Sequence, residues 1–410
     1  MQDAHAPQRL EAGTDGYRRA NLAMFVAGFA CFAMLYGTQP LLPLLVDHFG
    51  VSPATASLSV SAGTITLAAM LIPASLLSDR FGRQRVMRWS LIAAAVFATL
   101  SAVVTDFTQL LVLRGLLGMA IAGVPAAAMA YLGEEIAPNA QGRAMGLYIA
   151  GNAFGGMSGR VISALLADIG DWRIALAGLG VVGVVAALLF WRALPSSHHF
   201  RVRSLALSEL WRDVTAIYTD RGLPWLFLTA FLLMGAFVGF YNFLGFRLVA
   251  APFELAPAWI GAIFLTYMIG SWSSAWAGRL ADRFGRRNVL WAMTTVALVG
   301  LLTTLVDHLL PIAFGLALFT FGFFGAHSIA SGWVGRRAGE RRALGAAIYL
   351  SSYYLGGSVL GSSAGLAWAG HAWPGVVSLL AASIVAVLLV SLRLRTITPK
   401  QPTDPALAPA

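Results

Sequence analysis

The stretch Asp79-Arg80-Phe81-Gly82-Arg83 occurs twice in this chain of 410 residues. It returns 203 residues later as Asp282-Arg283-Phe284-Gly285-Arg286, and each copy lies between two long apolar stretches. A repeat at half the chain length indicates two related halves. A charged five-residue turn between apolar segments indicates that both halves are helical and lie in a membrane. Together these features favour a transporter whose two bundles rock against each other.

The composition excludes an ordinary soluble protein. Hydrophobic residues make up 58% of the chain and charged residues 11%, whereas soluble proteins are about 25% charged. Because roughly 20 apolar residues span a bilayer as a helix, we predict an all-α integral membrane protein with twelve transmembrane helices in two parallel six-helix repeats. The predicted spans are 20–46, 54–78, 85–104, 108–133, 140–167, 172–194, 222–250, 257–281, 288–306, 309–334, 340–368 and 373–393.

The repeat extends beyond the loop. Gly123 to Gly133 matches Gly325 to Gly335, and Tyr148 with Gly155-Gly156 matches Tyr349 with Gly356-Gly357, at nearly the same offset. The linker carries apolar residues at helical spacing, which predicts an amphipathic helix on the membrane interface. The predicted parts are an N-terminal tail at 1–19, bundles at 20–194 and 222–393, the linker at 195–221 between them, and a disordered tail at 394–410.

The distribution of charge predicts the orientation. The net charge is +10, but the cations gather in alternate loops, in the linker and in the tails. The opposite loops hold mainly aspartate and glutamate. This is the positive-inside pattern, so we expect both termini and the linker in the cytoplasm. Because the basic loops also suit the anionic inner leaflet, we expect the lipid bilayer and not a nucleic acid as the partner.

The loop 278–287 resembles the helix 2–3 signature of the major facilitator superfamily. Ser75 departs from the first copy of that signature, because the family usually has glycine there. Arg114 with Gly118 resembles the family's helix 4 motif. A third similarity is to the helix 5 signature of the family's exporters, where Gly156 replaces a proline: Gly142, Gly151, Gly155, Gly156 and Gly159. Residues 36–43 and 155–160 also resemble its YnfM-like (acriflavine-sensitivity) branch. The resemblance implies the family's fold, export and a bacterial inner membrane.

The loop motif has a physical role of its own. Two membrane helices reverse direction in about five residues, and glycine adopts the positive φ that such a turn favours. An aspartate at the C-terminal end of its helix is unfavourable, so we expect it to meet an arginine or another helix N-terminus. The resemblance implies gating, and a plain topology anchor is the alternative. The residues are Asp79, Arg80, Gly82, Arg83, Asp282, Arg283, Gly285 and Arg286.

No aspartate or glutamate lies in the middle of a predicted span, whereas Arg114 and Arg160 do. A midplane arginine costs roughly 2.5–3.5 kcal/mol on insertion scales, so both are either functional or members of a structural ion pair. His327 is the mid-membrane histidine, and histidine titrates near neutral pH. A neutral, hydrogen-bonded histidine is the alternative. The candidates for proton coupling are Arg114, Asp47 and His327.

Polar and aromatic residues in the spans predict a substrate cavity, because polar groups in lipid need partners or water. Some of them will only satisfy helix–helix hydrogen bonds. The predicted cavity residues are Tyr36, Gln39, Arg114, Asn152, Arg160, Tyr241, Asn242, His327 and Tyr353.

The sequence lacks a phosphate loop of the form GxxxxGK[ST], a metal-ligand cluster and a nucleophile–base pair. We therefore expect no enzyme activity, cofactor or metal. We predict proton-coupled efflux of a small amphipathic or drug-like molecule, by antiport and alternating access. We expect the protein to act as a monomer. The alternative is transport of a neutral or anionic solute, such as a sugar or organic acid, by proton coupling or uniport. A membrane sensor that binds ligand without flux is a third possibility.

Overall fold

The computed structural model describes residues 9–200 and 207–397, which are almost wholly helical and contain no β-strand. An isolated parallel bridge joins Leu10 to Ile136. The predicted tails and linker lie partly outside the described residues, at 1–8, 201–206 and 398–410. The prediction of a disordered C-terminal tail therefore falls almost entirely on residues that are not described.

Residues 9–200 form eight α-helices and one short 3-10 helix. They are α1 (Asp15–Tyr36), η1 (Gln39–Leu41), α2 (Leu42–Phe49), α3 (Pro53–Phe81), α4 (Arg83–Leu100), α5 (Phe107–Ile121), α6 (Gly123–Glu135), α7 (Pro138–Ile169) and α8 (Trp172–Ala193). The stretch predicted as the first span is thus broken between α1 and α2, and the fourth is divided into α5 and α6.

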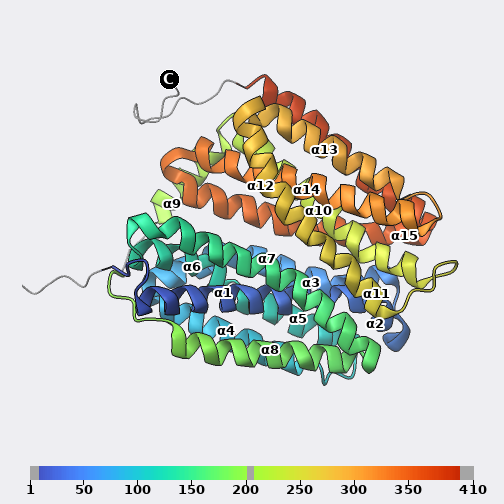
Figure 1. Ribbon diagram of the computed structural model, residues 1–410, viewed down its shortest axis with the longest axis horizontal. Helices are drawn as coiled ribbons and strands as arrows, with labels where there is room; N and C mark the ends of the chain where they lie inside the picture. Colours follow the sequence, from blue (N-terminus) through green and yellow to red (C-terminus); the bar gives the residue numbers. More distant parts are fainter. Residues whose placement is uncertain (1–8, 201–206, 398–410) are drawn as a thin grey trace, which may run out of the picture. The chain divides into compact units, whose positions relative to one another are not determined.

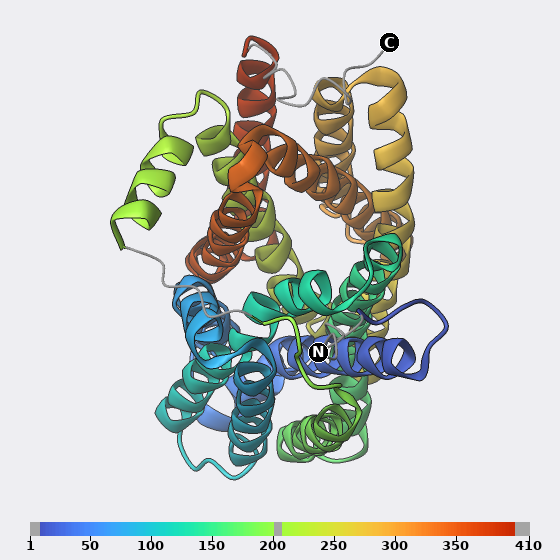
Figure 2. The ribbon, with the colours of Figure 1, turned by 90° about the vertical axis from the view of Figure 1, so that its left-hand side faces the viewer.

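The second half begins with the linker helix α9 (Leu207–Tyr218), which lies at the outer side of its unit (yellow-green, left in Figure 2). The remaining elements are α10 (Leu223–Val249), α11 (Pro257–Ala262), η2 (Ile263–Thr266), α12 (Tyr267–Phe284), α13 (Arg286–Thr303), α14 (Leu309–Ala338), η3 (Gly339–Arg341) and α15 (Arg342–Arg395). Non-helical φ/ψ at His371 and Ala372 divide α15 into two helices.

Six helical stretches of the described chain are long and apolar enough to cross a membrane, judged by length and composition alone. They are Asp15–Phe49, Pro53–Phe81, Phe107–Glu135, Trp172–Ala193, Leu223–Val249 and Leu309–Arg395. The last, at 87 residues, contains three predicted spans. Four predicted spans fall outside this set, in α4, α7, α11–α12 and α13, because charged or other polar residues lower their hydropathy. The count of twelve stays a prediction.

The helices form two compact units, and α3 contributes to both (Figure 1). One unit combines Met1–Val51, Ala62–Leu205 and Ala256–Phe264, and the other combines Ser52–Ser61, Ala206–Leu255 and Leu265–Ala410. Two segments group with the unit formed mainly by the other half of the chain: Ser52–Ser61 and Ala256–Phe264. Each is the beginning of the second predicted span of its half. The division into bundles at 20–194 and 222–393 stays a prediction, and these segments mark where the units differ from it.

Close packing of α1 against α7 organises the first unit, where the two helices lie side by side. The contact is made by three glycines spaced four residues apart on one face of α7, where an added Cβ would clash with the α1 backbone: Gly151, Gly155 and Gly159. Small residues at this spacing let helix backbones approach closely. The other two glycines of the predicted exporter-like motif differ, because a Cβ on Gly142 meets nothing within 4 Å and one on Gly156 makes only ordinary contacts.

The second unit repeats this contact between α10 and α15. A Cβ on Gly356 would clash with the backbone of Phe231, just as one on Gly155 would clash with Phe29. The two halves therefore share the helix packing that their aligned glycines predict. Packing alone accounts for these glycines, so they give no independent evidence for export.

Gly155→Ala should destabilise the protein by about 1–3 kcal/mol, because the new Cβ forces α7 away from α1. Gly146→Ala is the matched control on the same helix, since its Cβ meets nothing within 4 Å. The measurement is the unfolding temperature of the purified variants in one detergent. Equal unfolding temperatures for the two variants would show that the close contact does not stabilise the fold.

Candidate functional site

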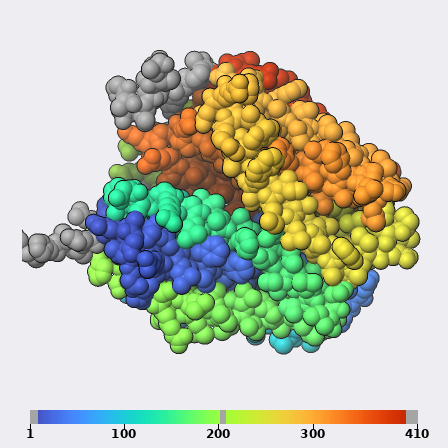
Figure 3. Space-filling model, in the orientation of Figure 1, coloured from blue at the N-terminus to red at the C-terminus, as the bar shows by residue number. Residues whose placement is uncertain are grey.

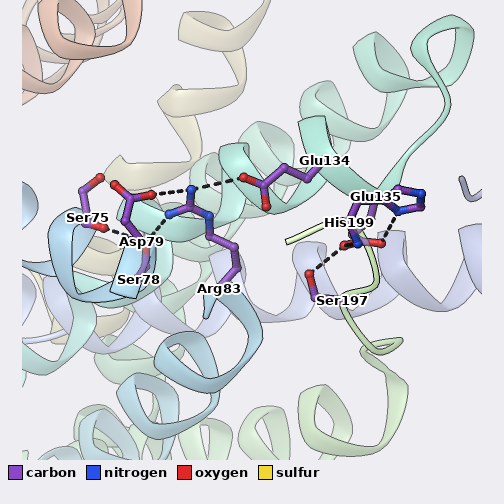
Figure 4. A network of polar contacts seen from close by, with 8 residues as sticks. All are labelled: Ser75, Ser78, Asp79, Arg83, Glu134, Glu135, Ser197 and His199. Carbon is purple, nitrogen blue, oxygen red and sulfur yellow. Dashed lines mark hydrogen bonds and ion pairs between the residues drawn. The ribbon is translucent and has the colours of Figure 1, made fainter. Parts of the chain in front are cut away.

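Arg83 lies at the centre of a buried network that joins α3, α4 and α6 (Figure 4). Its guanidinium lies 2.5 Å from Asp79 Oδ1 and 3.1 Å from Glu134 Oε1, and donates to Ser78 Oγ at 2.6 Å. Arg83 is 3% exposed and Asp79 is 9% exposed. The arginine thus offsets the unfavourable position of the Asp79 carboxylate at the C-terminal end of α3. Of these partners, sequence reasoning missed Glu134, which lies far from the motif along the chain.

The second copy of the loop motif is more open. Arg286 lies 3.8 Å from Asp282, whose side chain is 73% exposed. In both copies the turn glycine has a positive φ, 98° at Gly82 and 80° at Gly285, which is a conformation that favours glycine. The second residue of each copy is an arginine that stacks on the following ring, Arg80 on Phe81 and Arg283 on Phe284.

The chain that follows α8 is held on the end of α6 by Glu135 (Figure 4). The Glu135 carboxylate accepts hydrogen bonds from Ser197 Oγ at 2.6 Å and from the His199 backbone N–H at 2.9 Å. It also lies 3.0 Å from His199 Nδ1. Sequence reasoning missed this contact, because the partners are 64 residues apart and no motif links them.

A second contact fixes the linker to the other unit. Arg337 on α14 lies 2.5 Å from Asp220 Oδ1, and this oxygen also accepts from the backbone N–H groups of Gly222 and Leu223. Burial alone would raise the pKa of Asp220. The hydrogen bonds from Arg337 and the two N–H groups outweigh burial and hold the pKa below its usual value.

Arg114 is buried on α5, and its guanidinium binds the end of α1. It donates to the backbone oxygen of Met34 at 2.8 Å and to that of Leu35. Arg114 is 2% exposed. These carbonyls lie where α1 ends, and a carbonyl at a helix end in an apolar setting needs a donor. Arg114 therefore stabilises the break in α1, a function that sequence reasoning did not assign to it.

Arg160 approaches the same break from α7. Its Nε donates to Gln39 Oε1 at 2.6 Å and its Nη1 to the Gly156 oxygen at 2.6 Å. Its guanidinium lies 4.2 Å from the ring centroid of Tyr36 and 5.0 Å from that of Phe264. The structure thus brings together three predicted cavity residues, Tyr36, Gln39 and Arg160, beside the two carbonyls that Arg114 binds.

The other predicted residues of the first unit lie apart from this cluster. Asn152 packs its side chain against Gly28, so that a Cβ on that glycine would clash with Asn152 Oδ1. Asp47 is exposed on α2. Asp106 caps α5 by accepting a hydrogen bond from the backbone N–H of Gln109 at 2.9 Å.

In the second unit, Tyr241 on α10 joins two other helical segments. Its hydroxyl lies 2.8 Å from Thr266 Oγ1 and 2.7 Å from Thr320 Oγ1. Both Tyr241 and Asn242 are 1% exposed. The Tyr241 hydroxyl therefore cross-links helices. Helix–helix hydrogen bonding is the alternative role expected from the sequence for some of the predicted cavity residues.

His327 and Tyr353 lie together at the edge of an aromatic cluster. Their ring centroids are 4.6 Å apart, and the Tyr349 hydroxyl lies 3.0 Å from His327 Nδ1. Ring contacts continue through Phe323 and Phe237 to Tyr241. We name this set the aromatic cluster; its members are Phe237, Tyr241, Phe323, His327, Tyr349 and Tyr353. Sequence reasoning found half of them and missed the two phenylalanines and Tyr349.

Comparison with known proteins shows consistent similarity. The sequence profile of the Major Facilitator Superfamily matches residues 24–276. The chain is 44% identical over 346 residues to the inner membrane transport protein YnfM of Escherichia coli (strain K12), with 84% of this chain and 83% of YnfM covered. It is 42% identical over 344 residues to an uncharacterized MFS-type transporter, YybF, of Bacillus subtilis (strain 168), with 84% and 85% covered.

A solved structure shows the same fold. The chain matches a bacterial homologue of the human lysosomal transporter Spinster, in an inward-facing and unoccupied conformation, with a TM-score of 0.77 and 15% identity. The match covers 93% of this chain and 97% of the homologue. At this identity the likeness supports the fold alone.

The two motif aspartates should respond differently to substitution. Asp79→Asn removes one of the two carboxylates that contact the buried Arg83 and should destabilise the protein by up to about 3 kcal/mol, because only the partly exposed Glu134 remains to balance the cation. Asp282→Asn acts on an exposed pair and should cost no more than about 1 kcal/mol. The unfolding temperatures of both variants, measured side by side, decide this. A larger loss for Asp282→Asn would contradict the difference in burial.

The lowered pKa of Asp220 predicts a pH dependence of stability. Because the folded pKa lies below the unfolded value of about 3.9, the pair with Arg337 stabilises the fold above that value. This stabilisation is lost as pH falls through the folded pKa. Asp220→Asn should therefore lower the unfolding temperature at pH 7 and flatten its fall in acid. If the unfolding temperatures of the wild type and the variant differ by the same amount across this acid range, the assignment is contradicted.

Proposed function

Because the chain belongs to the major facilitator superfamily, we propose that it exports a small amphipathic or drug-like molecule in exchange for protons. Its family and its relatives are membrane transport proteins, and so the chain is a membrane transport protein and not an enzyme. Export, proton coupling and the class of substrate form the proposal. The transport cycle is alternating access, in which a substrate site opens to one side of the membrane at a time.

The observation that carries the proposal is the aromatic cluster of the second unit. It combines stacked rings, such as Phe237 on Phe323 at 3.8 Å, with hydroxyl and imidazole groups. Its residues His327 and Tyr353 are part-exposed, while the others are buried. A wall of this kind suits flat molecules that have an apolar body and a polar edge. We propose that the part-exposed His327 and Tyr353 contact the substrate in this unit, and we propose Tyr241 and Asn242 on α10 as buried residues of the same cavity.

A neutral or anionic solute is the second candidate, and the cluster around Arg160 favours it. Arg160 is 2% exposed and lies beside the Tyr36 ring and the Gln39 amide. A guanidinium binds a carboxylate through two parallel hydrogen bonds, and an amide and a ring suit a sugar or an organic acid. Arg114 and Asn152 complete the residues proposed for the first unit. Transport of such a solute would be proton-coupled or uniport.

For proton coupling we propose His327 before Asp47 and Arg114. Imidazole changes its charge between about pH 5 and 8 more readily than any other unperturbed side chain, and His327 belongs to the aromatic cluster, with its ring centroid 4.6 Å from that of Tyr353. Asp47 is exposed on α2, away from the carbonyls that Arg114 binds. Arg114 acts on coupling through the break in α1 and not as a proton carrier.

The proposal includes orientation and gating. The relative YnfM is an inner membrane protein, and the positive-inside pattern favours the inner membrane with both termini in the cytoplasm. We propose that the chain acts as a monomer. We propose that the two loop motifs act as gates; in the first copy, Arg83 holds three helices of its unit together through buried charged contacts.

The test is proton flux in energised inverted membrane vesicles that contain the protein. Acridine dyes, sugars and organic acids are added one at a time while the proton gradient is followed. An amphipathic cationic or neutral dye should collapse part of the gradient, and vector-only vesicles should show no response. His327→Gln should reduce this response, and His371→Gln, which changes an exposed histidine, serves as the matched control.

Each outcome has a defined meaning. A response to organic acids or sugars alone would favour the second candidate. Radiolabelled substrate uptake without a proton response would exclude antiport and favour uniport. Binding of a compound without uptake or proton release would contradict transport. An unchanged response in His327→Gln would remove this residue from the coupling pathway and leave the export proposal intact.

A further inference from the structure

Arg286 and Arg336 of the second unit occupy the positions at which the first unit has an arginine and a glutamate, and the two arginines repel each other electrostatically. Arg286 begins α13, and Arg336 lies near the end of α14. Arg336 is exposed and makes no hydrogen bond or ion pair within residues 9–200 and 207–397. The ion pair of Arg286 there is the 3.8 Å contact with Asp282.

The internal repeat supplies a template for this position. Arg286 corresponds to Arg83, and Arg336 corresponds to Glu134 in the alignment of Gly123–Gly133 with Gly325–Gly335. In the first unit the Glu134 carboxylate lies 3.1 Å from the Arg83 guanidinium. The second unit has the same turn and the same arginine, but its own chain supplies a second cation where the anion would be.

The electrostatics at this position are unfavourable without an added anion. Burial lowers the pKa of Arg286, and the charge of Arg336 lowers it further, while Asp282 opposes both only in part. The neighbouring Arg337 is occupied by Asp220 at 2.5 Å. The Gly285 cap of α13 provides no side-chain hydrogen bond to the first N–H groups of the helix, and these groups also favour an anion.

We propose that Arg286 and Arg336 bind a phosphate group at the start of α13. Arginine matches phosphate geometry through paired N–H donors, and the anion takes the place that Glu134 occupies in the first unit. The site is independent of the substrate cavity and of the proposed direction of transport.

Two sources could supply this phosphate: the headgroup of an anionic lipid or free phosphate. The turn between α12 and α13 is exposed on the surface of its unit (gold, near the top of Figure 3). It also lies at the end of two predicted membrane helices, where lipid headgroups are concentrated. An anionic phospholipid is therefore the favoured source, and free phosphate is the other arm of the test.

The test uses the full-length protein, freed of lipid in a neutral detergent. The unfolding temperature is measured with phosphatidylglycerol, with zwitterionic phosphatidylcholine, and with inorganic phosphate against chloride at constant ionic strength. Phosphatidylglycerol should raise the unfolding temperature more than phosphatidylcholine. Arg286→Gln and Arg336→Gln should weaken lipid binding roughly tenfold, since each loses a charge-assisted hydrogen bond.

Arg336→Glu is the decisive variant, because it restores the pattern of the first unit. It should raise the unfolding temperature without lipid and remove the response to phosphatidylglycerol. Arg279→Gln, which changes an exposed arginine on α12, is the matched control. A response to inorganic phosphate as well would support the phosphate site and extend it to free anions. No response to either source, or an equal loss of response in Arg279→Gln, would overturn the proposal.

Discussion

The break in α1 is the constraint on which the first unit depends. Pro40 and Pro43 follow it and lack the N–H groups that a continuous helix would need, so α1 ends at Tyr36 and resumes as η1 and α2. Backbone carbonyls exposed by such a break need donors in an apolar setting. Arg114 from α5 supplies them to Met34 and Leu35, and Ser163 on α7 donates to the Gly37 oxygen at 2.7 Å. The same break carries Gln39 to Arg160.

This arrangement explains why polar groups persist in so apolar a chain. Arg114 is fixed by two carbonyls and Arg160 by a carbonyl, an amide and two rings, so the cost of burying each cation is offset by several contacts. The glycines of α7 then determine how closely α1 can approach, which sets the distance over which Arg160 reaches Gln39. The contacts of Arg114 and Arg160 and the close packing of the α7 glycines thus all converge on the end of α1 and the residues that follow it. The second unit has its polar groups among aromatic rings instead, so the halves share packing but differ in chemistry.

The repeats in the sequence predicted the helical fold, the two turns and the close helix contacts, because the turn motif and the aligned glycines impose their geometry locally. Gly82 and Gly285 adopt the positive φ that the turn favours, and the spacing of Gly151, Gly155 and Gly159 places them on one face. Contacts between distant residues could not be predicted in this way. Nothing in the sequence spacing shows that Glu134 contacts Arg83. The spacing likewise does not show that Glu135 contacts His199. The break between α1 and α2 was likewise hidden within one apolar stretch, so Arg114 was considered for proton coupling, for the substrate cavity and for an ion pair, and not for this break.

The central claim is that Arg114 holds the break in α1, and hydrogen exchange tests it most directly. Amide exchange of residues 34–41 would be compared by mass spectrometry in the wild type, in Arg114→Met and in Arg143→Met, which changes an exposed arginine on α7. The account predicts that exchange in this segment rises about tenfold or more in Arg114→Met, since the lost bonds involve a charged donor, and stays unchanged in Arg143→Met. Equal exchange of residues 34–41 in all three proteins would contradict the claim.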